Sequence, residues 1–329
     1  MAPARPSRRT AAVTVALTMA AAVGAGLWWS TAGEDPDRDC AGLRTDNGIR
    51  SVLGASWRSD LPCGELADAL RRATTGSTSG SHTLEQARAM RTVLVAVASR
   101  TDHHVHPEVR RTLAQALADY ATDTHAVLTG INNVYTAHDG PGADAWQDEN
   151  GVHVAVQKNQ LTAVLRGLSE DPADYATLRA ADLQQGALGI AAIGANPSGP
   201  AIEDPLARAA APAGVFDAIA EDVQRDRDTK ARTSWQNAVL VDLAPAAAVP
   251  DFATDPAGHL AKSWLQQVTA APASFARLND QAADLLTLWA DATHLDKEKT
   301  SLPALQDRAR TTTDRERTET LTRFKQGGS

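Results

Sequence analysis

The stretch TLEQARAMRTVLVAV, residues 83–97, sets the fold class that this sequence predicts. It opens with the pattern T-x-x-Q, in which the Thr83 hydroxyl and the Gln86 side chain satisfy free backbone N–H groups at a helix start. Apolar side chains follow at steps of three and four and form one face: Leu84, Ala87, Met90, Leu94 and Val97. The stretch therefore predicts an amphipathic helix that packs this face against a core.

The composition favours helices along the whole chain. Aromatic residues make up only 4% of the sequence, although 43% of it is hydrophobic, and alanine and leucine dominate the apolar residues. Strands prefer β-branched and aromatic side chains, whereas helices prefer alanine and leucine. We therefore predict an all-α protein, an irregular multi-helix bundle of about eight helices that follows an N-terminal signal or anchor helix.

Prolines and glycines predict where several of these helices begin and end. Proline at a first helical position has no N–H to leave unsatisfied, so helices are expected to start at Pro107, Pro172 and Pro256. The first of them is expected to end at Gly130, before a polar loop over residues 131–151.

The middle of the chain leaves one choice of secondary structure open. GVHVAV, residues 151–156, alternates polar and apolar positions, which allows either a short strand or a helix that begins at His153. Further on, residues 196–205 are expected to end the helix that starts at Pro172. One long helix is then expected to start at Ala213 and to end at Pro245.

The first 31 residues have the charge pattern of an export segment. Residues 1–9 are basic, and residues 10–31, TAAVTVALTMAAAVGAGLWWST, carry no charge. Because positive flanks stay in the cytoplasm, the chain beyond this segment is expected to lie outside. Two interpretations stay open: a signal peptide cut after Ala32, or a transmembrane anchor of about 20 residues whose Trp28 and Trp29 lie in the outer interface.

These boundaries divide the chain into five predicted parts. They are a cytoplasmic basic tail (1–9), the signal peptide or transmembrane anchor (10–31), a disulfide-stapled N-terminal segment with a linker (32–81), an extracytoplasmic helical domain (82–301), and a charged C-terminal helix or tail (302–329). If it is not cleaved, the segment 10–31 makes the protein a single-pass membrane protein with its N-terminus inside.

The two cysteines support export. Cys40 and Cys63 both follow the apolar segment, and an even pair in an oxidising compartment is typical of a disulfide. Such a bond would stabilise the fold by about 3 kcal/mol on the chain-entropy account. The alternative is a two-thiolate metal site, but no further cysteine or histidine lies near enough in the sequence to complete four ligands.

A separate metal site is predicted from TDHHVHP, residues 101–107. Asp102, His104 and His106 alternate, and alternate side chains of an extended chain share one face. Their ligand types suit zinc. The other interpretation is a polar connector before the Pro107 helix. No other cofactor is predicted.

Charge and missing motifs limit the classes of function. The formal net charge is −8, which repels phosphate backbones and argues against a nucleic-acid partner. The sequence contains no H-E-x-x-H, G-x-S-x-G or C-x-x-C motif. No catalytic residue is therefore assigned, and an enzyme is the less favoured class.

Two stretches together resemble a group of uncharacterised actinobacterial helical proteins that are secreted or membrane-bound. They are LTAVLRGLSEDPADYATL, residues 161–178, and GVFDAIAEDVQRDRDTKARTSWQNAV, residues 214–239, within a similarity over about residues 161–294. The resemblance implies a helical fold and a surface or secretion-linked setting, and it brings no catalytic residues. We expect an exported protein that acts by protein–protein contact with an envelope protein. The alternative is a secreted metal-dependent hydrolase or toxin-like effector.

Overall fold

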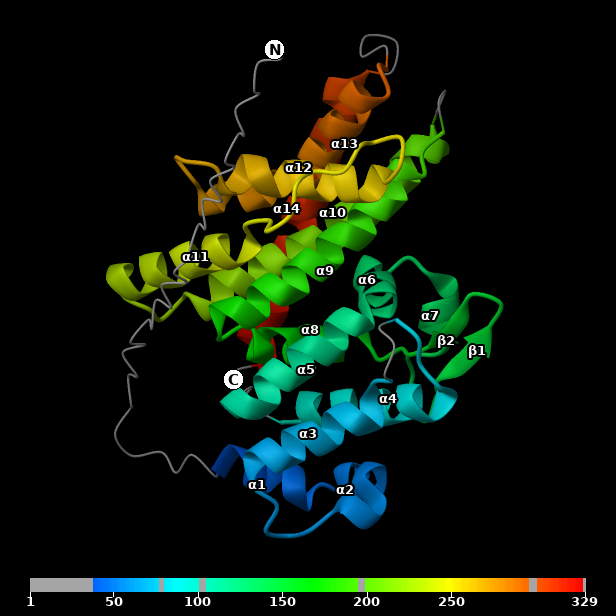
Figure 1. Cartoon of the computed structure of the whole chain (residues 1–329), viewed down its shortest axis with the longest axis vertical. Helices are drawn as coiled ribbons and strands as arrows, with labels where there is room; N and C mark the ends of the chain where they lie inside the picture. The colour runs from blue at the N-terminus through cyan, green and yellow to red at the C-terminus, as the bar shows by residue number, and fades with distance from the viewer. Residues whose placement is uncertain (1–37, 77–79, 101–104, 195–198, 296–300, 328–329) are drawn as a thin grey trace, which may run out of the picture. The chain divides into compact units, whose positions relative to one another are not determined.

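Helices account for nearly all regular structure in the described part of the chain (Figure 1). The computed structural model describes residues 38–76, 80–100, 105–194, 199–295 and 301–327. These residues form fourteen α-helices, two short 3-10 helices and one two-stranded antiparallel sheet. The predicted all-α class is confirmed, but the prediction of about eight helices was too low.

The bounds of the elements fall into two sets. The first comprises α1 (Arg38–Thr45), α2 (Asn47–Leu53), η1 (Gly54–Ser56), α3 (Cys63–Thr74), α4 (Leu84–Ala98), α5 (Pro107–Asp119), α6 (Ala121–Thr129), α7 (Asn133–Ala137), β1 (Trp146–Asp148) and β2 (Gly151–His153). The second comprises α8 (Lys158–Leu168), α9 (Pro172–Ala191), α10 (Pro200–Val223), α11 (Thr229–Leu243), α12 (Pro256–Thr269), η2 (Phe275–Asp280), α13 (Gln281–Ala292) and α14 (Leu302–Gly327).

The local start signals are confirmed. At α4 the Gln86 N–H donates to the Thr83 hydroxyl at 3.2 Å, and the Thr83 N–H donates to the Gln86 side chain at 2.8 Å. The apolar face that follows is buried. Pro107, Pro172 and Pro256 each occupy the first position of a helix, as predicted. These signals act within one helical turn, so they can be read from the sequence alone.

The helix predicted from Pro107 to Gly130 is two helices, α5 and α6. The helix is interrupted at Tyr120, whose backbone leaves the helical region at φ −94° and ψ 29°. The Tyr120 hydroxyl donates to the Thr74 carbonyl at 2.8 Å, so a contact with α3 fixes the break. Gly130 ends α6 in the left-handed region at φ 67°, as expected for a C-terminal glycine.

The loop predicted over residues 131–151 contains regular structure. It holds the five-residue helix α7 and strand β1, which pairs with β2 in the register Trp146↔His153 and Asp148↔Gly151. The alternation in residues 151–156 therefore marks a short strand, and the next helix begins at Lys158 rather than at His153. The loop prediction missed this hairpin because strands of three residues each carry too short a pattern to detect.

The long helix predicted from Ala213 to Pro245 is also divided. Helix α10 starts thirteen residues earlier, at Pro200, and contains Pro205 and Pro212. It ends at Val223, and Asp228 then caps α11 by accepting a hydrogen bond from the Ala231 N–H at 2.7 Å. Most of α10 is buried, and burial of this extent outweighs the lost backbone hydrogen bonds of its prolines.

The charged segment 302–329 forms a helix through residue 327 and packs along α10 (Figure 1). Gly214 of α10 permits this approach, because a Cβ there would lie 2.2 Å from the Thr313 carbonyl oxygen. Thr313, Glu316 and Thr320 of α14 are buried at the contact. The buried face of α14 was not predicted, because its side chains are hydroxyl and charged groups rather than apolar ones.

The predicted export segment, residues 10–31, lies outside the described residues. Among the residues that are described, no helix combines the length and the apolar character needed to cross a bilayer. The proposed division at residues 81 and 301 stays a prediction.

Candidate functional site

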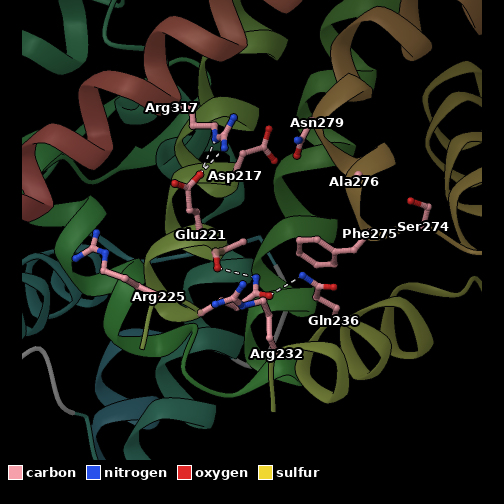
Figure 2. A pocket seen from close by; sticks show the side chains of 12 residues that line it. Asp217, Glu221, Arg225, Arg232, Gln236, Ser274, Phe275, Ala276, Asn279 and Arg317 are labelled. Atoms are coloured by element: carbon pink, nitrogen blue, oxygen red, sulfur yellow. Dashed lines mark hydrogen bonds and ion pairs between the residues drawn. The ribbon is translucent and has the colours of Figure 1, made fainter. Parts of the chain in front are cut away.

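A hollow of about 610 Å³ opens among α10, α11, η2 and α14 (Figure 2). We call it the arginine hollow. Its side chains come from four segments: Asp217, Ala220, Glu221, Gln224 and Arg225 from α10 and the turn after it, Arg232 and Gln236 from α11, Ser274, Phe275, Ala276 and Asn279 at η2, and Arg317 from α14. The α10 side chains recur at steps of three and four and therefore share one face. A hollow of this size can hold a small molecule or a short peptide segment.

Two of its three arginines are paired with carboxylates. Arg317 donates from Nε to Glu221 Oε2 at 3.0 Å, and Arg225 forms an ion pair with Asp222. Arg232 instead donates to a backbone carbonyl oxygen at 3.3 Å, and none of the described carboxylates pairs with it. The hollow therefore presents one guanidinium whose charge no neighbouring acid neutralises.

Asp217, at one end of the arginine hollow, belongs to a buried ion pair. Arg179 of α9 is fully buried, and its guanidinium donates to Asp217 Oδ1 at 2.8 Å, to Gln281 Oε1 at 2.9 Å and to the Leu278 carbonyl at 2.8 Å. These bonds link α9 to α10, η2 and α13. Because removing one member of a buried pair leaves the other charge without a partner, this ion pair fixes the Asp217 end of the hollow in place.

Asp217 has one oxygen that the protein does not use. Its Oδ1 accepts from Arg179, but Oδ2 has no hydrogen-bond partner in the described part of the chain, and the side chain is 3% exposed. Burial raises the pKa of the Asp217 carboxyl, while the Arg179 guanidinium opposes this rise. A buried acceptor without a donor costs stability, and Asp182 Oδ2 on α9 is in the same state.

An aromatic ring forms one wall. Phe275 is half-buried and lies against Trp235 and Tyr175, with ring centroids 5.6 Å and 6.5 Å away. Figure 2 shows its ring between the Asp217 end and the Gln236 end of the hollow. Gln236 donates to the Gln224 side chain at 2.7 Å, which ties α11 to α10. The wall is apolar and rigidly backed by the core.

The cysteine prediction is confirmed: Cys40 and Cys63 form a disulfide with Cα atoms 5.8 Å apart. His106 lies beside it, and ligand atoms of the two cysteines and this histidine are all within 4.8 Å of one another. His106 lies 43 residues after Cys63 in the sequence but next to it in space. The sequence analysis therefore did not count it as a neighbour of the cysteines. With the sulfurs bonded to each other, neither is available as a thiolate ligand.

The predicted zinc trio is described only in part. Asp102 and His104 lie outside the described residues. His106 caps α5, where its Nδ1 accepts from the Glu108 N–H at 3.3 Å, so this nitrogen serves the helix start. The cap supports the polar-connector interpretation for His106, and the zinc site stays a prediction.

A second polar group lies at the hairpin, and sequence analysis missed it too. We call Asp123, Tyr135, Asp148 and His153 the hairpin cluster. His153 Nδ1 contacts Asp123 Oδ1 at 2.9 Å, and its Nε2 contacts Asp148 Oδ1 at 3.0 Å. The Tyr135 hydroxyl donates to Asp123 Oδ1 at 2.5 Å, and the Val154 N–H donates to Asp123 Oδ2 at 3.3 Å.

The two carboxylates of the hairpin cluster change the titration of its histidine. The hydrogen bond to Asp123 raises the pKa of His153, with Asp148 adding to the effect and burial opposing it. Burial and Asp123 also raise the pKa of Tyr135 far above its usual value of 10.0. The raised pKa favours the charged form of His153, in which both ring nitrogens donate to the neighbouring carboxylates.

One sequence signal could have indicated the arginine hollow. Asp217 interrupts the apolar stripe of Phe216, Ile219 and Val223, and an acid at a core position requires a partner. The sequence could not supply that partner, because Arg179 lies 38 residues away on another helix.

No known protein family matches this chain, and neither the curated proteins nor the solved structures include one with significant similarity to it.

Proposed function

We propose that this protein is exported and acts outside the cytoplasm by binding a partner protein through the arginine hollow. Two observations support export. The Cys40–Cys63 disulfide suits an oxidising compartment, and the uncharged segment 10–31 follows a basic terminus. In this proposal the segment 10–31 either tethers the protein to the membrane or is removed on export.

The observation that carries the binding role is the combination of an unneutralised Arg232 with an unsatisfied Asp217 oxygen in one hollow. Arginine and aromatic side chains dominate the binding energy of protein interfaces, and Phe275 adds the aromatic surface. A partner that supplies both an acceptor for Arg232 and a donor for Asp217 would satisfy two groups that the protein alone leaves without matching partners.

Site-directed photo-crosslinking in intact cells tests this function. A photoreactive amino acid in place of Ala276, which is exposed and lines the hollow, should trap one defined exported protein. The same group in place of Val241, which is 72% exposed and lies outside the hollow, serves as the matched control. Random neighbours at both positions would contradict the proposal.

The compartment has its own test. The mass of the mature N-terminus distinguishes a chain that begins at Gly33 from one that retains residues 1–32. Full-length protein that stays soluble inside cells with Cys40 and Cys63 reduced would contradict export.

A metal-dependent hydrolase or toxin-like effector is the second candidate. It rests on the predicted zinc trio, of which His106 alone is described; the disulfide beside His106 offers no thiolate ligand. Elemental analysis of the purified protein, with His106→Ala as the comparison, tests this candidate. Stoichiometric zinc that is lost in the variant would support it, and zinc retained in the variant or absent from both would contradict it.

A further inference from the structure

The charge of the arginine hollow selects the chemistry of its ligand. Of its three arginines, Arg317 and Arg225 already have carboxylate partners, and Arg232 has none among the described residues. A single open guanidinium matches one carboxylate, with which it forms two parallel hydrogen bonds. A phosphate carries nearly twice the charge of a carboxylate, which exceeds the single positive charge that the hollow leaves without an acidic partner.

The spacing of the lining residues sets the length of the ligand. Gln224 directly follows α10 and lies seven residues after Asp217, which is about 10 Å at the rise of a helix. Gln224 bonds to Gln236 of α11 at 2.7 Å, and Arg232 is one turn before Gln236. The acceptor at Asp217 and the guanidinium of Arg232 therefore lie toward opposite ends of the hollow, as Figure 2 shows. An extended peptide spans about 10 Å with three residues.

The groups between the two ends suit a peptide. Phe275 offers a ring against which an apolar side chain can pack, since it is itself half-buried against Trp235. At the far end, Asp217 Oδ2 is an enclosed acceptor without a donor, so a ligand N–H reaches it once the side chain turns toward the hollow. Because Arg179 already balances the charge of Asp217, the matching donor is a neutral N–H rather than an ammonium group.

The geometry points to an extended peptide segment of about three residues as the ligand of the arginine hollow, with a carboxylate on Arg232 and a backbone N–H on Asp217. This inference rests on the proposed function, because it assumes that the hollow is the surface that meets the partner protein. The carboxylate can come from an Asp or Glu side chain or from a chain terminus, since both present the same group to a guanidinium.

Calorimetric titration of the full-length, oxidised protein with acetylated tripeptides tests the inference. Acetyl-Gly-Leu-Glu amide presents a side-chain carboxylate, and acetyl-Gly-Leu-Gln amide is its uncharged counterpart. Acetyl-Gly-Leu-Ala as the free acid presents a terminal carboxylate, with its amide as the counterpart. We expect at least one acid to bind about tenfold or more tightly than its counterpart, and the acid that does so identifies the source of the carboxylate.

Two substitutions on α11 show whether the hollow is responsible. Arg232→Gln should abolish the tenfold preference, because the guanidinium is removed. Lys230→Gln removes the same charge from an exposed position that does not line the hollow, and it should leave the preference unchanged. An equal loss in both variants would mean nonspecific charge attraction and would overturn the inference. Tighter binding of acetyl-Gly-Leu-phosphoserine amide than of either acid would overturn the choice of carboxylate.

The Asp217 end is tested by changing the ligand, because Asp217→Asn would also disturb Arg179. Methylation of one backbone nitrogen at a time should weaken binding at least tenfold at a single amide, the one that donates to Oδ2. Equal effects at every amide would contradict this contact.

If the Ala276 crosslinker traps a defined partner while acids and amides bind alike, the peptide chemistry fails and the proposed function stands. If the acids bind through Arg232 but no partner is trapped, the proposed function fails instead.

Discussion

The arginine hollow and the hairpin cluster each contain a buried aspartate paired with a basic side chain, but they differ in how many of the aspartate's oxygens accept hydrogen bonds. In the hairpin cluster, Asp123 accepts hydrogen bonds at both oxygens, from His153 and Tyr135 at Oδ1 and from a backbone N–H at Oδ2. At the hollow, Asp217 accepts at Oδ1 only. Both side chains are at least nine-tenths buried, so burial alone does not separate them.

This difference is why we treat the hairpin cluster as a structural network and propose the arginine hollow as a binding site. A satisfied buried network holds its elements together, and Asp123 joins α6 to the hairpin through His153 and the backbone of residue 154. An unsatisfied buried acceptor costs about 1–3 kcal/mol, which a ligand that brings a donor can offset. Both aspartates line a hollow, Asp217 the arginine hollow and Asp123 a separate one of about 390 Å³, so the contrast lies in the oxygens: protein donors occupy both of Asp123 and only one of Asp217.

The largest effect is expected where a buried charge loses its partner. Arg179→Met should lower the free energy of unfolding by about 3–5 kcal/mol, because the carboxylate of Asp217 stays buried without a counter-charge. Equilibrium urea unfolding followed by circular dichroism measures this loss. The double variant with Asp217→Leu removes both charges and should recover most of the stability. If Arg179→Met alone were as stable as the wild type, the buried ion pair at Asp217 would not hold the fold together, and the comparison with the hairpin cluster would fail.

A smaller loss is expected at the hairpin cluster. Asp123→Asn keeps the shape of the side chain but weakens its charge-assisted bond to His153 and turns one acceptor into a donor, for a loss of about 2 kcal/mol. Arg232→Gln at the exposed rim of the hollow should change stability by less than about 0.5 kcal/mol. Urea unfolding of both variants sharpens the contrast between a structural contact and a binding contact. A larger loss for Arg232→Gln than for Asp123→Asn would reverse it.

The sequence allowed the helix starts to be predicted wherever the signal lay within one turn. The T-x-x-Q box at Thr83, Asp171-Pro172 and Asp255-Pro256 are signals of this kind. The breaks at Tyr120 and after Val223 were missed, because contacts with other elements rather than local propensity decide them. Proline inside α10 was misjudged for the same reason, since burial of this helix exceeds the local cost of its prolines.

Prediction of the sites followed the same division. The Cys40–Cys63 disulfide could be predicted because a chain with only two cysteines offers one pairing. The arginine hollow could not, because its lining comes from four elements, and Arg317 lies 100 residues after Asp217. The proximity of His106 to the disulfide was likewise invisible, because the sequence places no other ligand near the cysteines.

Asp174 is a buried acid that has, among the described residues, neither an ion pair like that of Asp217 nor a hydrogen-bond network like that of Asp123. It is 5% exposed in the first turn of α9, and burial together with Asp171 raises its pKa to about 6. The folded state therefore binds a proton more tightly than the unfolded state, so the free energy of unfolding should fall as pH rises from about 4 to about 6.

Asp174→Asn should remove this fall and stabilise the protein at pH 7 by about 1 kcal/mol, a net figure after loss of the favourable acid at the helix N-terminus. At pH 4 the variant and the wild type should differ little. The Tm of both proteins, measured across this range, checks the prediction. A variant that is equally destabilised at both pH values would show that Asp174 makes a structural contact instead.

The smallest effect concerns the titration of the hairpin cluster. Because the folded pKa of His153 is raised above 6.5, protonated His153 stabilises the fold fully below that pH, and this contribution is lost as pH rises through the raised value. The stability difference between wild type and His153→Gln should therefore shrink from pH 6 to pH 9, by less than about 1 kcal/mol because Asp148 is exposed to solvent. Asp148→Asn should shrink the pH-dependent part further, since one of the two acids that raise the pKa is removed.

Nuclear magnetic resonance titration of the His153 ring protons gives its pKa directly. A pKa at or below 6.5 in the wild type would mean that the two carboxylates do not hold the charged ring, and the hairpin cluster would then lose its status as the satisfied counterpart of the arginine hollow.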